Sequence, residues 1–112
     1  MKMYVLVILK TGSKRTEDKA LLDSLFAGHF SNMKRLVEEK KLTVAGPLEN
    51  NEKKYRGIFI LDVPTVEEAQ KIIATDPAVN AKIFDIELYP CYGSAALPLY
   101  LKDADRVRKK QM

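Results

Sequence analysis

The spacing of the hydrophobic residues changes several times along this chain, and the order of the changes restricts the fold more than any other feature. Strand-type runs cover residues 3–9, 42–48, 57–63 and 82–90, and helix-type spacing covers about 17–40 and 66–75. The order strand, helix, strand, strand, helix, strand is typical of a ferredoxin-like α+β domain. We therefore predict four antiparallel strands with both helices on one face of the sheet.

The opposite face of such a sheet carries no helix, and several side chains predicted to lie on it are apolar. An exposed apolar face of this size usually marks an interface. A second copy of the chain, packed face to face, buries it and gives a dimer with two-fold symmetry. We therefore predict a homodimer formed through the sheet face, which could assemble further into a higher oligomer.

Size and composition favour one soluble domain. The chain has 112 residues, 46% of them hydrophobic and 30% charged, which is ordinary for a globular protein. No run approaches the ~20 apolar residues that cross a bilayer. The apolar run near the N-terminus has six residues before Lys10 and no small-residue cleavage site after it, so it fits a first strand better than a signal peptide. We expect a cytoplasmic protein that does not bind membranes.

The charge distribution gives no sign of nucleic-acid binding. The formal net charge is +4, and four basic residues between Arg106 and Lys110 supply much of the excess. The rest of the chain interleaves acidic and basic residues without the basic stripe that nucleic acids need. The single cysteine, Cys91, excludes an internal disulfide framework and has no Cys or His neighbour at zinc-site spacing. We expect no metal, and Cys91 is a poor nucleophile candidate because the only histidine lies far away in sequence.

That histidine, His29, falls on the apolar face of the predicted helix 17–40, where another leucine would be expected. Two interpretations stay open. The imidazole could pack among leucines, with its nitrogens bonded to a backbone carbonyl or a water. It could instead line a pocket between helix and sheet and transfer protons. Imidazole is suited to proton transfer because its ordinary pKa lies near neutral pH. A base of this kind usually needs a partner that fixes its tautomer.

Asp76 is the best candidate for that partner. It is predicted to follow the helix 66–75 directly, and the C-terminal end of this helix can approach the middle of the first helix. The alternative is ordinary loop chemistry, since Asp-Pro commonly begins a turn. A carboxylate after a helix C-terminus is disfavoured by the helix dipole, and such a costly position is a small hint of function.

Four motifs in order resemble the YCII-related (YciI-like) family: AGHFSNMKRLVEEKKLTVAGPL, RGIFIL, EEAQKIIATDPAV and ELYPCYGSAA. The resemblance covers about residues 1–96, which we take as one domain, and leaves residues 97–112 as a tail with helical potential. It implies a dimeric α+β barrel built from ferredoxin-like subunits. It also implies a histidine–aspartate active site, whose two residues map onto His29 and Asp76.

The resemblance implies a small-molecule enzyme, since related barrels include muconolactone isomerases and a dehydrochlorinase of a chlorinated hydroxyhydroquinone. We predict a cofactor-independent lyase or isomerase that uses His29 and Asp76 on a small, cyclic, oxygenated substrate. Arg56, Tyr92 and Ser94 are the candidate substrate-binding residues. The alternative is a non-enzymatic dimer that binds a small ligand in the same cleft or serves as an accessory protein. Haem ligation by His29 is a third interpretation, because some dimeric barrels bind haem through a histidine.

Overall fold

The computed structural model describes residues 1–13 and 17–95, and in these residues the predicted order of elements is present. The elements are β1 (Lys2–Thr11), α1 (Lys19–Glu38), β2 (Leu42–Pro47), β3 (Tyr55–Leu61), α2 (Val66–Ile73), α3 (Pro77–Asn80) and β4 (Phe84–Gly93). The strands form one antiparallel sheet in the order β2-β3-β1-β4. This confirms the ferredoxin-like α+β fold. The tail predicted at 97–112 lies outside the described residues.

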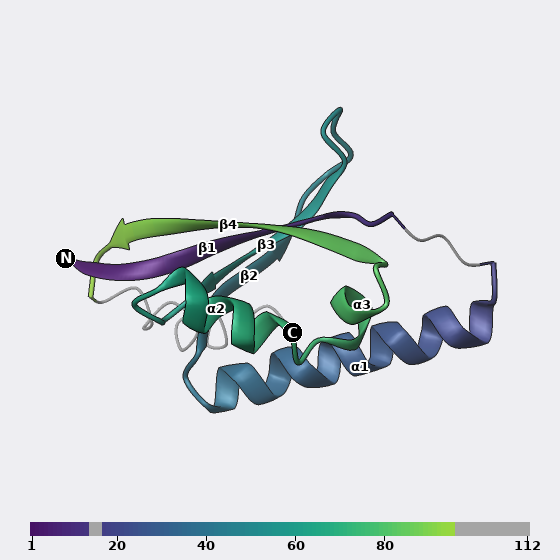
Figure 1. The fold of residues 1–112 in the computed structure, drawn as a ribbon, viewed down its shortest axis with the longest axis horizontal. Coiled ribbons are helices and arrows are strands. Elements are labelled where there is room, and N and C mark those ends of the chain that lie inside the picture. The colour runs from purple at the N-terminus through teal and green to yellow at the C-terminus, as the bar shows by residue number, and fades with distance from the viewer. Residues whose placement is uncertain (14–16, 96–112) are drawn as a thin grey trace, which may run out of the picture.

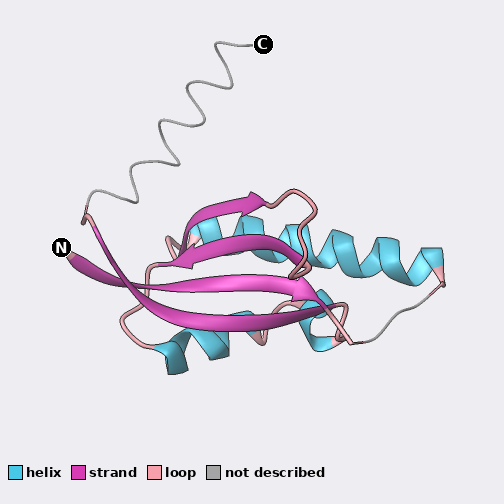
Figure 2. Cartoon of the chain, turned by 90° about the horizontal axis from the view of Figure 1, so that it is seen from above, coloured by secondary structure: helices cyan, strands magenta, loops and turns pink. Residues whose placement is uncertain are grey.

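All three described helices lie on the same side of the sheet (Figure 1). Seen from the other side, no described helix covers the strands (Figure 2). Side chains alternate across each strand, so on β1 the buried Val5, Val7 and Leu9 belong to the core on the helix side. The residues between them, Leu6 and Ile8, are only partly buried. We call their side of the sheet the open face.

The core lies between the sheet and the helices. Its buried side chains come from several elements and include Leu36, Leu42, Phe59, Leu61, Ala69 and Ile73. β2, which ends at Gly46-Pro47, is an outer strand of the sheet. None of the helices among the described residues is both long enough and apolar enough to cross a membrane.

The helix ends follow from local capping. The Asp18 carboxylate accepts a hydrogen bond from the Leu21 amide at 3.2 Å and begins α1. Lys40 takes a left-handed φ of 61° just after α1, and its amide bonds back to the Val37 carbonyl, which ends the helix. Thr65 caps α2 through the Glu68 amide, as the Thr-x-x-Glu spacing predicts.

The short helix α3 lies between the predicted helix 66–75 and the last predicted strand, where the sequence analysis placed no helix. Asp76 is its N-cap and Pro77 is its first residue. Both choices favour a helix start, because a carboxylate accepts the free amides of the first turn and proline already has a helical φ. A single turn is too short to produce the spacing by which helices are predicted from sequence.

Candidate active site

His29 and Asp76, which are 47 positions apart in the sequence, meet in the protein interior. Only 5% of the His29 surface and 1% of the Asp76 surface is exposed. Nδ1 of His29 forms a hydrogen bond with Oδ2 of Asp76. The structure therefore brings together the two residues that the sequence analysis named as a catalytic pair.

The other carboxylate oxygen of Asp76 holds the start of α3. Oδ1 accepts hydrogen bonds from the amides of Ala78 at 2.9 Å and Val79 at 3.4 Å. The prediction that a carboxylate at this position destabilises the fold is therefore wrong. The Asp76 side chain bonds to the first turn of the next helix, where a carboxylate is favoured. Bonds to both oxygens fix the orientation of the carboxylate.

Gly28 explains how α1 and α3 come close enough for this contact. A Cβ atom added at Gly28 would lie 2.8 Å from Cγ of Pro77, closer than packed carbon atoms lie. The missing side chain thus lets the Pro77 ring pack directly on α1, one residue away from both members of the pair. Gly28 lies directly before His29 in the first family motif, but no role was predicted for it from the sequence. A small residue beside the inward-facing histidine was the available signal.

The hydrogen bond also decides which ring nitrogen is free. An ionised carboxylate only accepts hydrogen bonds, so with Asp76 ionised the Nδ1–H of His29 donates and Nε2 keeps its lone pair. Among the described residues, Nε2 has no hydrogen-bond partner, and no fully buried side-chain nitrogen or oxygen is left unsatisfied. Nε2 is therefore accessible, and the space next to it is the cavity that His29 lines.

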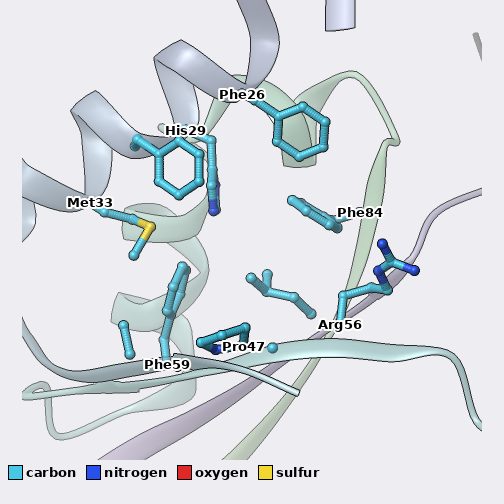
Figure 3. A pocket seen from close by; sticks show the side chains of 12 residues that line it. Phe26, His29, Met33, Pro47, Arg56, Phe59 and Phe84 are labelled. Atoms are coloured by element: carbon cyan, nitrogen blue, oxygen red, sulfur yellow. The ribbon is translucent and has the colours of Figure 1, made fainter. Parts of the chain in front are cut away.

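This cavity has a volume of about 460 Å³ and lies between α1 and the sheet (Figure 3). Its walls are largely aromatic and aliphatic, and include Phe26, Phe30, Met33, Phe59 and Phe84. The His29 ring stacks on Phe59 with the ring centroids 5.9 Å apart, and lies 5.4 Å from both Phe30 and Phe84. Close-packed rings hold the imidazole in one position beside the cavity.

These aromatic residues belong to the site but were not predicted from the sequence. Phe30 is 63% exposed, and a large aromatic residue directly after an inward-facing histidine was the available signal for a pocket mouth. Phe59 and Phe84 carry no such signal, because they read as ordinary core residues of strands.

Of the three predicted substrate-binding residues, the structure brings only Arg56 to the cavity. Tyr92 and Ser94 lie at the opposite end of β4, where Gly93 pairs with Lys2, whereas the cavity borders the end at Phe84. Tyr92 is 68% exposed, and the Ser94 carbonyl accepts a 2.6 Å hydrogen bond from the Tyr4 hydroxyl. Cys91 is also absent from the cavity lining.

Comparison with solved structures supports the fold. The 5-chloro-2-hydroxyhydroquinone dehydrochlorinase TftG from Burkholderia phenoliruptrix AC1100, in complex with 2,5-dihydroxybenzoquinone, is 18% identical. It aligns with a TM-score of 0.51 over 80% of this chain and 93% of its own. A dimeric protein of unknown function and ferredoxin-like fold from Bacteroides fragilis NCTC 9343 is 7% identical, with a TM-score of 0.52 over 81% of this chain and 95% of its own.

The comparison with curated proteins gives no match. The sequence profile of the YCII-related domain, however, matches residues 3–90, which is most of the chain and includes His29, Arg56 and Asp76. This confirms the family resemblance that the four motifs indicated. The chain belongs to the YCII-related domain family.

Proposed function

We propose that this protein is a small-molecule lyase or isomerase in which His29 transfers the proton and Asp76 orients the imidazole. The observation that carries the proposal is the buried hydrogen bond between Nδ1 of His29 and Asp76, with Nε2 left open to the cavity. A general base needs a lone pair within reach of the substrate and a partner that fixes its tautomer. Both requirements are met at this site.

The reaction begins when Nε2 takes a proton from a C–H or O–H group of the substrate. Asp76 stabilises the resulting imidazolium, because its carboxylate is already bonded to Nδ1–H. The electron pair left on the substrate then forms a new double bond. In an elimination, a leaving group departs with its own bonding pair. In an isomerisation, the imidazolium returns the proton to a different carbon atom.

A flat, oxygenated ring is the substrate shape that the cavity favours. Aromatic rings on several sides suit a planar ligand, and a volume of about 460 Å³ lies in the range of small-molecule sites. The structurally similar dehydrochlorinase is described as a complex with 2,5-dihydroxybenzoquinone, which is a ligand of this shape. We therefore choose a chlorinated hydroxyhydroquinone as the first substrate to test, and an unsaturated lactone as the second.

The test is turnover of these compounds by the wild type and by His29→Ala and Asp76→Asn. Removing a general base typically costs on the order of 10²–10⁴ in kcat, so His29→Ala should lose activity by that factor while keeping its circular dichroism spectrum. Activity of His29→Ala close to that of the wild type would refute the proposal. Saturable binding without product formation would instead favour the non-enzymatic ligand-binding alternative.

Asp76→Asn is the sharper variant because asparagine caps helices as well as aspartate does. If the amide oxygen keeps the bonds to the Ala78 and Val79 amides, the NH₂ group faces His29. The Nδ1 atom must then accept, and the proton moves to Nε2. The base is lost without removal of the imidazole, so we expect a large fall in kcat with an intact fold.

We also propose that two copies associate through the open face. Its partly buried apolar side chains are Leu6, Ile8, Val44, Ile58 and Ile60, on three adjacent strands. Burying them against a second copy would add apolar contact worth about 25 cal/mol per Å². The ferredoxin-like protein from Bacteroides fragilis is described as dimeric, which supports this proposal.

A further inference from the structure

The cavity gains a charged side chain from an irregularity in the sheet. Along β1 and β3, Leu9 pairs with Gly57 but the next residue, Lys10, pairs with Tyr55, so that Arg56 has no partner on β1. This extra residue is a β-bulge. Bulges interrupt the alternation of side chains, and here the result is specific: Arg56 and Gly57 both line the cavity on the helix side.

Neighbouring side chains confirm the change of direction. Tyr55, directly before the bulge, lies on the open face, where the Lys10 amino group is 5.9 Å from its ring centroid. Ile58 lies on the open face, so if the side chains of β3 alternated regularly, Arg56 would point to the open face as well. Because of the bulge it lies at the edge of the cavity, where Figure 3 shows it reaching from the strand. Gly57 has no side chain, and a Cβ atom at this position would lie only 3.0 Å from the Gly46 carbonyl oxygen.

The guanidinium group of Arg56 is not committed to another protein group. No carboxylate among the described residues lies within ion-pair distance of it, and no side-chain hydrogen bond from it is found in residues 1–13 and 17–95. Arg35, by contrast, bonds to Glu39 at 2.8 Å and to Asn32 at 2.8 Å. Arg56 and His29 are the only ionisable side chains among the described residues that line the cavity.

We infer that the cavity binds a planar ring carrying an acidic substituent, a carboxylate or an ionised phenol, and that Arg56 pairs with this substituent. Arginine presents a flat fork of N–H donors that matches such oxygens, and charge-assisted hydrogen bonds are the strong ones. The ring of the ligand packs between the aromatic side chains of the cavity and faces His29. Its acidic substituent then lies at the edge of the cavity, beside Arg56. This inference rests on the proposed function, because it assigns the substrate class of the same site.

The test uses the sole histidine as a reporter of binding. The ring C–H signals of His29 are followed by NMR during titration with 4-hydroxybenzoate and with its uncharged analogue 4-hydroxybenzamide. We expect saturable shifts with the acid and a dissociation constant about tenfold or more higher for the amide, since hydrogen bonds to charged groups exceed neutral ones by that much. Arg56→Gln should raise the dissociation constant of the acid by a similar factor and leave that of the amide unchanged.

Two variants separate the specific contact from general charge. Lys71→Gln removes one positive charge from the exposed surface of α2 and should leave the affinity for the acid unchanged. Arg56→Lys keeps the charge without the planar fork and should recover only part of the affinity. Equal affinity for acid and amide, no shift of His29 at millimolar acid, or an unchanged affinity in Arg56→Gln would each overturn the inference.

Failure of this inference is distinguishable from failure of the proposed function. His29→Ala can be titrated through the ligand signals, and it should still bind the acid through Arg56. Acid-selective binding that depends on Arg56, together with full turnover by His29→Ala, would retain the substrate class and refute the general base. Turnover that depends on His29 but not on Arg56 would retain the general base and refute the substrate class.

Discussion

The two faces of the sheet are built from alternating residues of the same strands, yet they place their polar groups differently. On the helix side, one buried pair, His29 and Asp76, is surrounded by apolar side chains. On the open face, polar groups stand beside the apolar ones and are partly exposed: Glu87 pairs with Lys10 at 3.4 Å and accepts a 2.6 Å hydrogen bond from Tyr89.

A buried polar pair is tolerated on the helix side of this fold because its hydrogen bonds are satisfied there. Buried polar groups are costly unless they are fully bonded, and Asp76 meets this condition with three hydrogen bonds to Ala78, Val79 and His29. On the open face of the single chain, Lys10 and Glu87 are partly exposed and pair with each other. Arg56 is the one charged residue of β3, and the bulge places its side chain at the cavity on the helix side instead of on the open face.

The largest effect on stability should come from the helix side. Leu61 is fully buried and Ile60, its neighbour in the chain, is partly exposed on the open face. Leu61→Ala should lower the free energy of unfolding by about 2–5 kcal/mol, because it leaves a cavity in the core. Ile60→Ala should cost less than half as much in denaturant titrations of dilute protein. Equal losses for both variants would contradict the difference between the faces.

The next effect concerns association. Ile8 lies on the open face between Ile58 of β3 and Glu87 of β4. Ile8→Lys would bury a charge in the proposed dimer interface, so we expect the dimer to dissociate about a hundredfold more readily while each protomer stays folded. Sedimentation velocity over a range of concentrations measures this. An unchanged dimer would exclude this face as the interface.

Gly28→Ala tests how the pair is positioned. Alanine normally favours a helix over glycine by about 1 kcal/mol, so a stabilised protein would mean that the contact with Pro77 is unimportant. We expect the opposite, a loss of about 1–3 kcal/mol, because a methyl group must displace the Pro77 ring. Gly46→Ala is the matched control in thermal unfolding, since a Cβ atom there meets nothing within 4 Å.

The smallest effect comes from Glu87 on the open face. Hydrogen bonding from the Tyr89 hydroxyl, followed by smaller contributions from Tyr55 and Lys10, lowers the pKa of Glu87 below its ordinary value of 4.5. A lowered pKa in the folded state gives stability that is present above the ordinary pKa and is lost as the pH falls through the lowered one. Glu87→Gln should therefore be slightly less stable than the wild type at neutral pH, and the difference should vanish in acid.

Much of this molecule could be predicted from its sequence. Hydrophobic spacing is enough to place four strands and two helices, and the inward position of His29 on α1 follows from the same spacing. Asp76 was named as its partner from its place after the second helix. Features that depend on one residue were not predictable in this way. The single turn of α3 has no periodicity, although Asp76-Pro77 is a helix-start signal that was interpreted as a turn.

The positions of the substrate-binding candidates show the same limit. Arg56 lines the cavity only because of a bulge that no spacing pattern in β3 reveals. Tyr92 was chosen for its place at a strand end, and Ser94 because it falls in the matched motif ELYPCYGSAA. The antiparallel pairing of β1 and β4 puts that end of β4 beside Lys2, far along the strand from Phe84. Which end of a strand borders a cavity depends on register and packing, and these are properties of the whole fold.

The central claim is that Asp76 holds the proton of neutral His29 on Nδ1, so that Nε2 is a free base in the cavity. Nitrogen-15 NMR of the imidazole measures this directly, since the chain has a single histidine. In buffer alkaline enough to keep the imidazole neutral, we predict a protonated Nδ1 and an unprotonated Nε2 in the wild type, and the reverse in Asp76→Asn. A proton on Nε2 in the wild type would contradict the account.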